Sequence, residues 1–109
     1  MLMRLSTLIF VIFYLFLTSC SKEELKSEVI EEKEISLQMI DAYEEGLIAL
    51  EDQDGLTAAK KFSEAELLFP QSKWAPRASL MAAYSYYSYN YYQDAIYELE
   101  RFLKTYPDH

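Results

Sequence analysis

The segment "GLTAAKKFSEAELLFP", residues 55–70, decides the fold because a diverged second copy, "YQDAIYELERFLKTYP", occupies residues 92–107. A shift of 37 residues aligns the two copies, and the alignment extends to the residues before each of them. It places Gly46 on Ala83, Ala49 on Tyr86, Ala58 on Ala95, Phe62 on Leu99, Ala65 on Phe102 and Pro70 on Pro107. A fixed period of this size is the signature of stacked supersecondary units.

Apolar residues in both copies recur at intervals of three and four, which is the period of an amphipathic helix. We expect a first helix from Leu37 to the "DQDG" turn at 52–55, and a second from Gly55 to Pro70. A third should be capped by Ser72 and run to about Ser88, and a fourth should cover 92–106. Since no segment alternates for long with period two, the predicted fold class is all-α.

The paired helices resemble the tetratricopeptide repeat. That repeat has a small residue where its two helices cross, an Ala-x-x-x-Phe pair on the second helix, and a closing proline. The small residue is Gly46 in the first helix pair and Ala83 in the second. The spaced pair corresponds to "AAKKF" and "AIYEL", and the closing proline to "FP" and "YP". The usual tryptophan is replaced by Ala42 and Ser79, and the period is longer than the roughly 34 residues of that repeat. The resemblance implies a short right-handed solenoid of two units, 37–72 and 73–109.

The N-terminus has the pattern of a secretion signal. "MLMR" is a short cationic start, and the apolar run 5–17 is shorter than the ~20 residues of a membrane-spanning helix. Cys20, the only cysteine, follows Leu17, Thr18 and Ser19, and this resembles the lipobox of bacterial lipoproteins. The resemblance implies a signal peptide at 1–19 and a lipidated Cys20. Residues 21–36 are charge-dense and contain no aromatic residue, so with Cys20 we expect an acidic tether over 20–36, either solvated throughout or partly helical where it joins the next segment. Ser21, which takes the place of a retention aspartate, favours the outer membrane.

Charge and motif content exclude several functions. The chain carries 18 acidic and 10 basic side chains, so its surface repels nucleic acid and we expect no nucleic-acid partner. The lone histidine, His109, leaves Cys20 without a base for nucleophilic catalysis. There is no glycine-rich phosphate loop and no metal-ligand spacing. We therefore expect no enzyme activity, no catalytic residue, no metal and no cofactor.

The segment "YSYYSYNYYQ", residues 84–93, contains six tyrosines. Repeat geometry puts Tyr86 inside the helix pair and makes Asn90 a left-handed helix terminator. It assigns Tyr84 and Tyr87 to a groove. The full predicted groove face is Ile40, Tyr43, Leu47 and Leu50 on the first helix, then Arg77, Leu80, Tyr84 and Tyr87 on the third. Arg77 either offers its guanidinium to a carboxylate, or is solvated or paired with Glu44 or Glu45.

Three segments together resemble the BamD family of outer-membrane β-barrel assembly lipoproteins: the lipobox, "FPQSKWAPRASLMAAYSYY" and "ERFLKTYPDH". The resemblance covers residues 17–109. Family members carry more such repeats than the two found here, so we expect a truncated chain. It implies a place on the periplasmic face of the outer membrane, with BamA and other members of the assembly machinery as partners. In the family the C-terminal repeats hold BamA and BamC, and we expect that half to be missing from this chain. The resemblance also implies that unfolded outer-membrane β-barrel proteins bind the groove residues Tyr43, Leu47, Arg77, Leu80, Tyr84 and Tyr87.

Two other functions fit the same residues. One is a different tetratricopeptide lipoprotein, such as a pilotin or a cell-division coordinator, which would differ in repeat number. The other is a lipoprotein with a catalytic domain further along, such as a peptidoglycan hydrolase. Sequence beyond His109 would separate them from the assembly lipoprotein.

Overall fold

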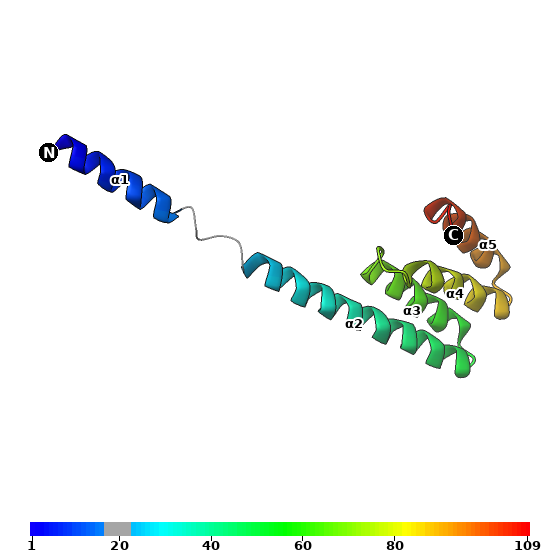
Figure 1. Cartoon of the computed structure of the whole chain (residues 1–109). Coiled ribbons are helices and arrows are strands. Elements are labelled where there is room, and N and C mark those ends of the chain that lie inside the picture. Colours follow the sequence, from blue (N-terminus) through cyan, green and yellow to red (C-terminus); the bar gives the residue numbers. More distant parts are fainter. Residues whose placement is uncertain (17–22) are drawn as a thin grey trace. The chain divides into compact units, whose positions relative to one another are not determined.

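A computed structural model describes residues 1–16 and 23–109, and in these residues it contains helices and no strands (Figure 1). The helices are α1 (Leu2–Phe16), α2 (Glu23–Glu51), α3 (Gly55–Leu68), α4 (Ala75–Ser88) and α5 (Tyr92–Thr105). The predicted all-α class is therefore confirmed. By internal contacts the chain divides into a unit of residues 1–32, which includes α1, and a second unit of residues 33–109. Cys20 and the rest of the predicted lipobox lie outside the described residues.

The period of 37 residues is present in the backbone of the second unit. Helices α3 and α5 begin one period apart and end one period apart. The C-termini of α2 and α4 are also separated by one period. The turns that follow α2 and α4 also correspond, since Gln53 and Asn90 both have a positive φ, of 61° and 67°. The Asp54 and Tyr91 amides each donate to the carbonyl five residues earlier, at 2.9 Å. The left-handed conformation predicted for Asn90 is thus present, and it occurs in both copies.

The core of this unit is built mainly from alanine, which lets the helices approach closely. One cluster joins Met39 and Ala42 of α2 to Ala65 of α3 and Ala78 of α4. A second joins Ala49, Ala58 and Ala82 around the fully buried ring of Phe62. A Cβ added to Gly46 would lie 2.8 Å from that ring, so a larger residue would force the helices apart. The small residue predicted at this crossing has a clear steric reason.

Helix α2 begins well before Leu37, the position at which the apolar stripe starts. Its first turns, from Glu23, are made of the charge-rich segment that was predicted to be a tether. Glutamate, lysine and leucine are strong helix formers, and neither glycine nor proline interrupts residues 21–45. Hydrophobic periodicity located the buried part of the helix and did not locate its first residue.

The expectation that Ser72 caps α4 is wrong. Trp74 holds the N-cap position, without a side-chain cap bond, and proline stands in the first turn of the helix. Ser72 instead lies in the preceding turn, where its amide donates to the Phe69 carbonyl at 3.0 Å and its carbonyl accepts from Ala75 at 3.2 Å. The Ser72 hydroxyl is buried and has no partner among the described residues. Proline at the start of a helix has no amide hydrogen to satisfy, so less capping is needed there.

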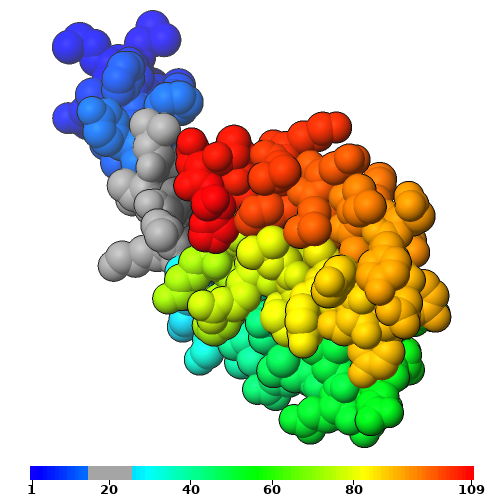
Figure 2. Space-filling model, turned by 90° about the vertical axis from the view of Figure 1, so that its right-hand side faces the viewer, coloured from blue at the N-terminus to red at the C-terminus, as the bar shows by residue number. Residues whose placement is uncertain are grey.

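Helix α4 lies between α3 and α5, as the green, yellow and orange-to-red segments of Figure 2 show. A polar cluster ties the three helices together. Arg101 on α5 donates to both carboxylate oxygens of Glu66 on α3, to Glu98, and to the Ser79 hydroxyl on α4. Tyr106 donates to Glu66 at 2.7 Å. Glu66 is almost fully buried, so these bonds supply the partners that an interior carboxylate needs.

Candidate functional site

The predicted groove residues occupy corresponding faces of α2 and α4. The 37-residue period aligns Tyr43 with Leu80, Leu47 with Tyr84, and Leu50 with Tyr87. On each helix these residues recur every three or four positions beside the buried alanines, so they form one stripe adjacent to the core. Leu47, Leu80, Tyr84 and Tyr87 are all exposed. The second unit therefore presents two apolar and aromatic stripes, one on each helix.

Tyr43, like Leu50, is half-buried and packs against the core, unlike the other predicted groove residues. Its ring packs edge-on against Phe62 at 5.0 Å and against Trp74 at 5.9 Å between centroids. Burial raises the pKa of the Tyr43 hydroxyl, and the positive charge of Arg77 opposes that shift. Tyr43 thus belongs partly to the packing between the helices, and only part of the ring is available to a ligand.

Arg77 is exposed and stacks on the indole ring of Trp74, with Cζ 4.9 Å from the ring centroid. Among the described residues no carboxylate forms an ion pair with it, and Glu45 instead pairs with Lys61 at 2.5 Å. The stacking holds the guanidinium by its face, which leaves its N–H edges free to bind a carboxylate. Trp74 was not among the site residues predicted from the sequence. Its place three residues before Arg77, at the start of a helix, indicates that the two side chains are neighbours.

The remaining tyrosines of the 84–93 segment fill the turn between α4 and α5. Tyr86 is half-buried and contacts Tyr91 edge-on at 6.4 Å, while the exposed Tyr87 contacts Tyr92 at 5.6 Å. Burial raises the pKa of the Tyr86 hydroxyl, and the nearby Asp94 and Glu98 carboxylates add to the shift. The segment is therefore divided between packing and exposure: Tyr86 and Tyr89 are half-buried, whereas Tyr84, Tyr87, Tyr91 and Tyr92 are exposed.

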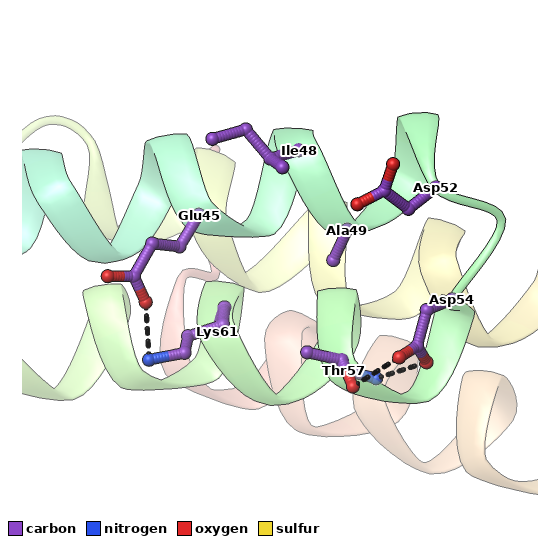
Figure 3. Close-up of a pocket in the computed structure, with 7 residues that line it drawn as sticks. All are labelled: Glu45, Ile48, Ala49, Asp52, Asp54, Thr57 and Lys61. Atoms are coloured by element: carbon purple, nitrogen blue, oxygen red, sulfur yellow. Dashed lines mark hydrogen bonds and ion pairs between the residues drawn. The ribbon is translucent and has the colours of Figure 1, made fainter.

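A pocket of about 250 Å³ lies between α2 and α3, away from these stripes (Figure 3). Its walls include Glu45, Asp52 and Asp54, but two of these carboxylates already have partners. Glu45 pairs with Lys61, and Asp54 accepts hydrogen bonds from the amide and hydroxyl of Thr57 at 3.0 and 2.6 Å. The Thr57 bonds lower the pKa of Asp54 and cap α3. The carboxylates of Glu45 and Asp54 therefore stabilise the local structure of α2 and α3.

Residues that could hold a metal ion do not converge in the described part of the chain. Within residues 1–16 and 23–109, no helix combines the length and the apolar character that a membrane crossing requires.

Comparison with known proteins gives the family. The model of the YfiO family, described as outer membrane lipoprotein, matches residues 36–109, which include the C-terminal part of α2 and all of α3 to α5. This chain belongs to the YfiO family of outer membrane lipoproteins. The resemblance to BamD proteins noted from the sequence is confirmed at the level of the family.

One curated relative of this YfiO-family chain is the outer membrane protein assembly factor BamD of Caulobacter vibrioides (strain ATCC 19089 / CIP 103742 / CB 15). It is 34% identical over 79 residues, which are 72% of this chain and 25% of the relative. The chain thus spans about a quarter of the length of that relative. No solved structure matches significantly.

Proposed function

We propose that this protein is a lipid-anchored component of the outer-membrane β-barrel assembly machinery and that it binds unfolded outer-membrane proteins. Membership of the YfiO family and the similarity to an assembly factor support this proposal. The observation that carries it is the pair of exposed apolar stripes on α2 and α4, with Arg77 stacked on Trp74 beside them. In this proposal the two helix pairs are tetratricopeptide repeats of a right-handed solenoid, and the stripes line its concave groove.

The groove chemistry fits the end of a β-barrel strand. Such an end is an extended segment with alternate apolar residues, a terminal aromatic ring and a free carboxylate. Leu47, Leu80, Tyr84 and Tyr87 supply apolar and aromatic contacts, and tyrosine combines a large apolar ring with a hydroxyl that can bind exposed backbone. Arg77 supplies the cation for the carboxylate, since a guanidinium fork can bind two carboxylate oxygens.

The anchor is a thioether lipid on Cys20. In this proposal residues 1–19 are removed as a signal peptide, and residues 20–36 form the anchored segment before the repeats of 37–72 and 73–109. The protein then lies on the periplasmic face of the outer membrane, where BamA and the other members of the machinery are its partners. The acidic surface is suited to neutral or basic partners.

The groove can be tested by fluorescence anisotropy with a labelled peptide that ends in an aromatic residue, prepared as the free acid and as the amide. We expect the purified full chain with Tyr84→Ala and Tyr87→Ala to bind the free-acid peptide about tenfold more weakly. A few aromatic residues usually supply most of the binding free energy of an interface, and this double variant removes two of them. Arg77→Leu should weaken the free acid and leave the amide nearly unchanged. Tyr97→Ala removes an equally exposed tyrosine from α5 and is the matched control.

Normal binding by the Tyr84 and Tyr87 double variant would show that these rings are not the binding surface. If Arg77→Leu weakened binding of the free-acid and amide peptides equally, the guanidinium would not be the group that binds the carboxylate. Denaturant melts of each variant separate lost binding from lost folding.

A further inference from the structure

Trp74 stands at the start of α4, in a position where tryptophan has no capping role. It holds the N-cap position, at which short polar side chains usually accept a hydrogen bond from the first turn, but it forms no such cap bond. Its indole ring is 37% exposed and carries the Arg77 guanidinium over one face. The needs of the helix end therefore do not explain this ring.

The two copies of the repeat show that the fold does not require this pair of side chains. One period earlier, Trp74 corresponds to Leu37 and Arg77 corresponds to Ile40. Both of these residues are exposed on α2. The first helix pair thus forms without an aromatic ring or a cation at these positions. The stack of Arg77 on Trp74 is a feature of α4 alone and needs a reason beyond the repeat.

Contacts that start in the core hold the Trp74 ring. The fully buried Phe62 ring contacts Tyr43 edge-on at 5.0 Å between centroids, and Tyr43 contacts Trp74 edge-on at 5.9 Å. The Arg77 Cζ then lies 4.9 Å from the Trp74 centroid. Arg77 is also near the Tyr43 hydroxyl, since its positive charge opposes the rise in the Tyr43 pKa that burial causes. A continuous series of ring contacts therefore joins the core to an exposed guanidinium.

This stack restricts a side chain that would otherwise move freely. An exposed arginine has many rotamers, and ordering it when a ligand binds costs conformational entropy. Contact with the indole face holds the guanidinium in place before the ligand arrives, and it leaves the N–H groups at the edge of the guanidinium plane for a carboxylate. Trp74 should therefore raise the affinity for a carboxylate that it does not itself bind.

We propose that Trp74 positions Arg77 to bind the terminal carboxylate of a peptide, and that this contact fixes the direction of the peptide in the groove. This inference rests on the proposed binding of unfolded outer-membrane proteins to the α2 and α4 stripes. Arg77 is in the first turn of α4. The stripe residues Leu80, Tyr84 and Tyr87 follow it at intervals of three, four and three residues. The C-terminal end of the peptide therefore lies at the start of α4, and its chain runs toward Tyr87.

The lengths of the two chains agree with this direction. Arg77 and Tyr87 are ten residues apart, which is about 15 Å along a helix. An extended peptide rises roughly 3.3 Å per residue, so its last four or five residues cover the same distance. Alternate side chains of an extended peptide point the same way, so the last residue and those two and four places before it can all contact the stripe.

The test uses the free-acid and amide forms of the labelled peptide, which are titrated with the purified full chain in detergent solution and read by anisotropy. Trp74→Leu introduces the residue type that the first copy has at this position, in Leu37. We expect it to weaken binding of the free acid about tenfold and binding of the amide much less, because only the free acid needs an ordered guanidinium. Trp74→Phe keeps an aromatic face and should retain most of the preference for the free acid.

A double-mutant cycle shows whether Trp74 acts through Arg77. Once Arg77→Leu has removed the guanidinium, adding Trp74→Leu should weaken binding of the free acid no further. A purely structural role of Trp74 would instead weaken binding of both peptides in both backgrounds. Tyr97→Leu is the matched control, because it removes an exposed aromatic ring from α5 and should leave both affinities unchanged.

The direction of the peptide can be read from Trp74 itself, since it is the only tryptophan of the chain. An iodinated phenylalanine quenches tryptophan fluorescence at contact distance. Placed at the last residue of an otherwise unlabelled free-acid peptide, it should quench Trp74 emission. Placed four residues earlier, about 13 Å away along an extended chain, it should leave the emission unchanged.

The outcomes separate this inference from the proposed function. If the unmodified chain binds neither peptide, or binds both equally, the proposed carboxylate site fails and this inference fails with it. If the unmodified chain prefers the free acid and Trp74→Leu keeps that preference, only the positioning role of Trp74 is overturned. Quenching that is as strong from the earlier position as from the last residue would overturn the direction.

Discussion

Arg101 on α5 donates to both carboxylate oxygens of Glu66 on α3, at 3.0 and 2.6 Å. The two residues are 35 positions apart, and their pairing also joins Glu98, Ser79 and Tyr106. The hydrogen bonds that Arg101 donates to Glu66 raise the pKa of Arg101, so the guanidinium stays charged at every relevant pH. The pair fixes how α5 packs, because a displaced α5 would leave a buried carboxylate without its cation.

We expect Arg101→Met to lower the free energy of unfolding by about 3 kcal/mol, because breaking a buried ion pair leaves an uncompensated charge. Glu66→Leu with Arg101→Leu should recover most of that loss, since leucine already stands at the counterpart of Glu66, in Leu103. Urea denaturation of the three proteins measures both effects. Arg101→Met with an unchanged midpoint would show that the pair does not hold α5.

The second prediction concerns the crossing of α2 and α3. Gly46→Ala should lower the free energy of unfolding by about 1–3 kcal/mol, because the new methyl group would meet the Phe62 ring. The second copy has Ala83 and Leu99 at the counterparts of Gly46 and Phe62. Phe62→Leu should therefore cost less in the Gly46→Ala background than in the original chain. A double-mutant cycle in urea tests this, and strict additivity of the two changes would contradict it.

The third prediction concerns the two left-handed residues. Gln53→Gly should raise the free energy of unfolding by about 1 kcal/mol, because glycine adopts positive φ without the steric cost of a Cβ. Asn90→Gly should gain less, since asparagine tolerates this conformation and its side-chain oxygen accepts from Tyr92 at 2.8 Å. Thermal melts of both variants, with Gln53→Ala as the control, give the comparison. A larger gain in stability for Asn90→Gly than for Gln53→Gly would show that Asn90 carries the greater backbone strain.

The fourth prediction concerns the anchor. Cys20→Ala should abolish incorporation of labelled palmitate and leave an uncleaved precursor, because no other side chain in the chain carries a thiol. Cys20→Ser keeps the size and polarity of the residue and should fail in the same way, since its hydroxyl is a far weaker nucleophile. Palmitate label retained by either variant would place the modification elsewhere.

The sequence by itself determined the all-α class and the 37-residue period, but not the residues at which α2 and α4 begin. Ala58, Phe62 and Pro70, repeated as Ala95, Leu99 and Pro107, predicted two helix pairs offset by 37 residues, and Asn90 predicted the left-handed turn. These features were readable because helix period, turn conformation and helix termination are local, and each depends on residues within one or two turns of one another.

Only the tertiary structure decided how the side chains were divided between the core and the surface. The half-burial of Tyr43 depends on Phe62 and Trp74, and the failure of Ser72 to cap α4 depends on a turn held by Phe69 and Ala75. Arg101 reads as one more charged residue on an exposed helix, yet it pairs with Glu66. Such contacts join residues far apart in the chain, and their formation depends on how closely alanine-rich faces let the helices approach.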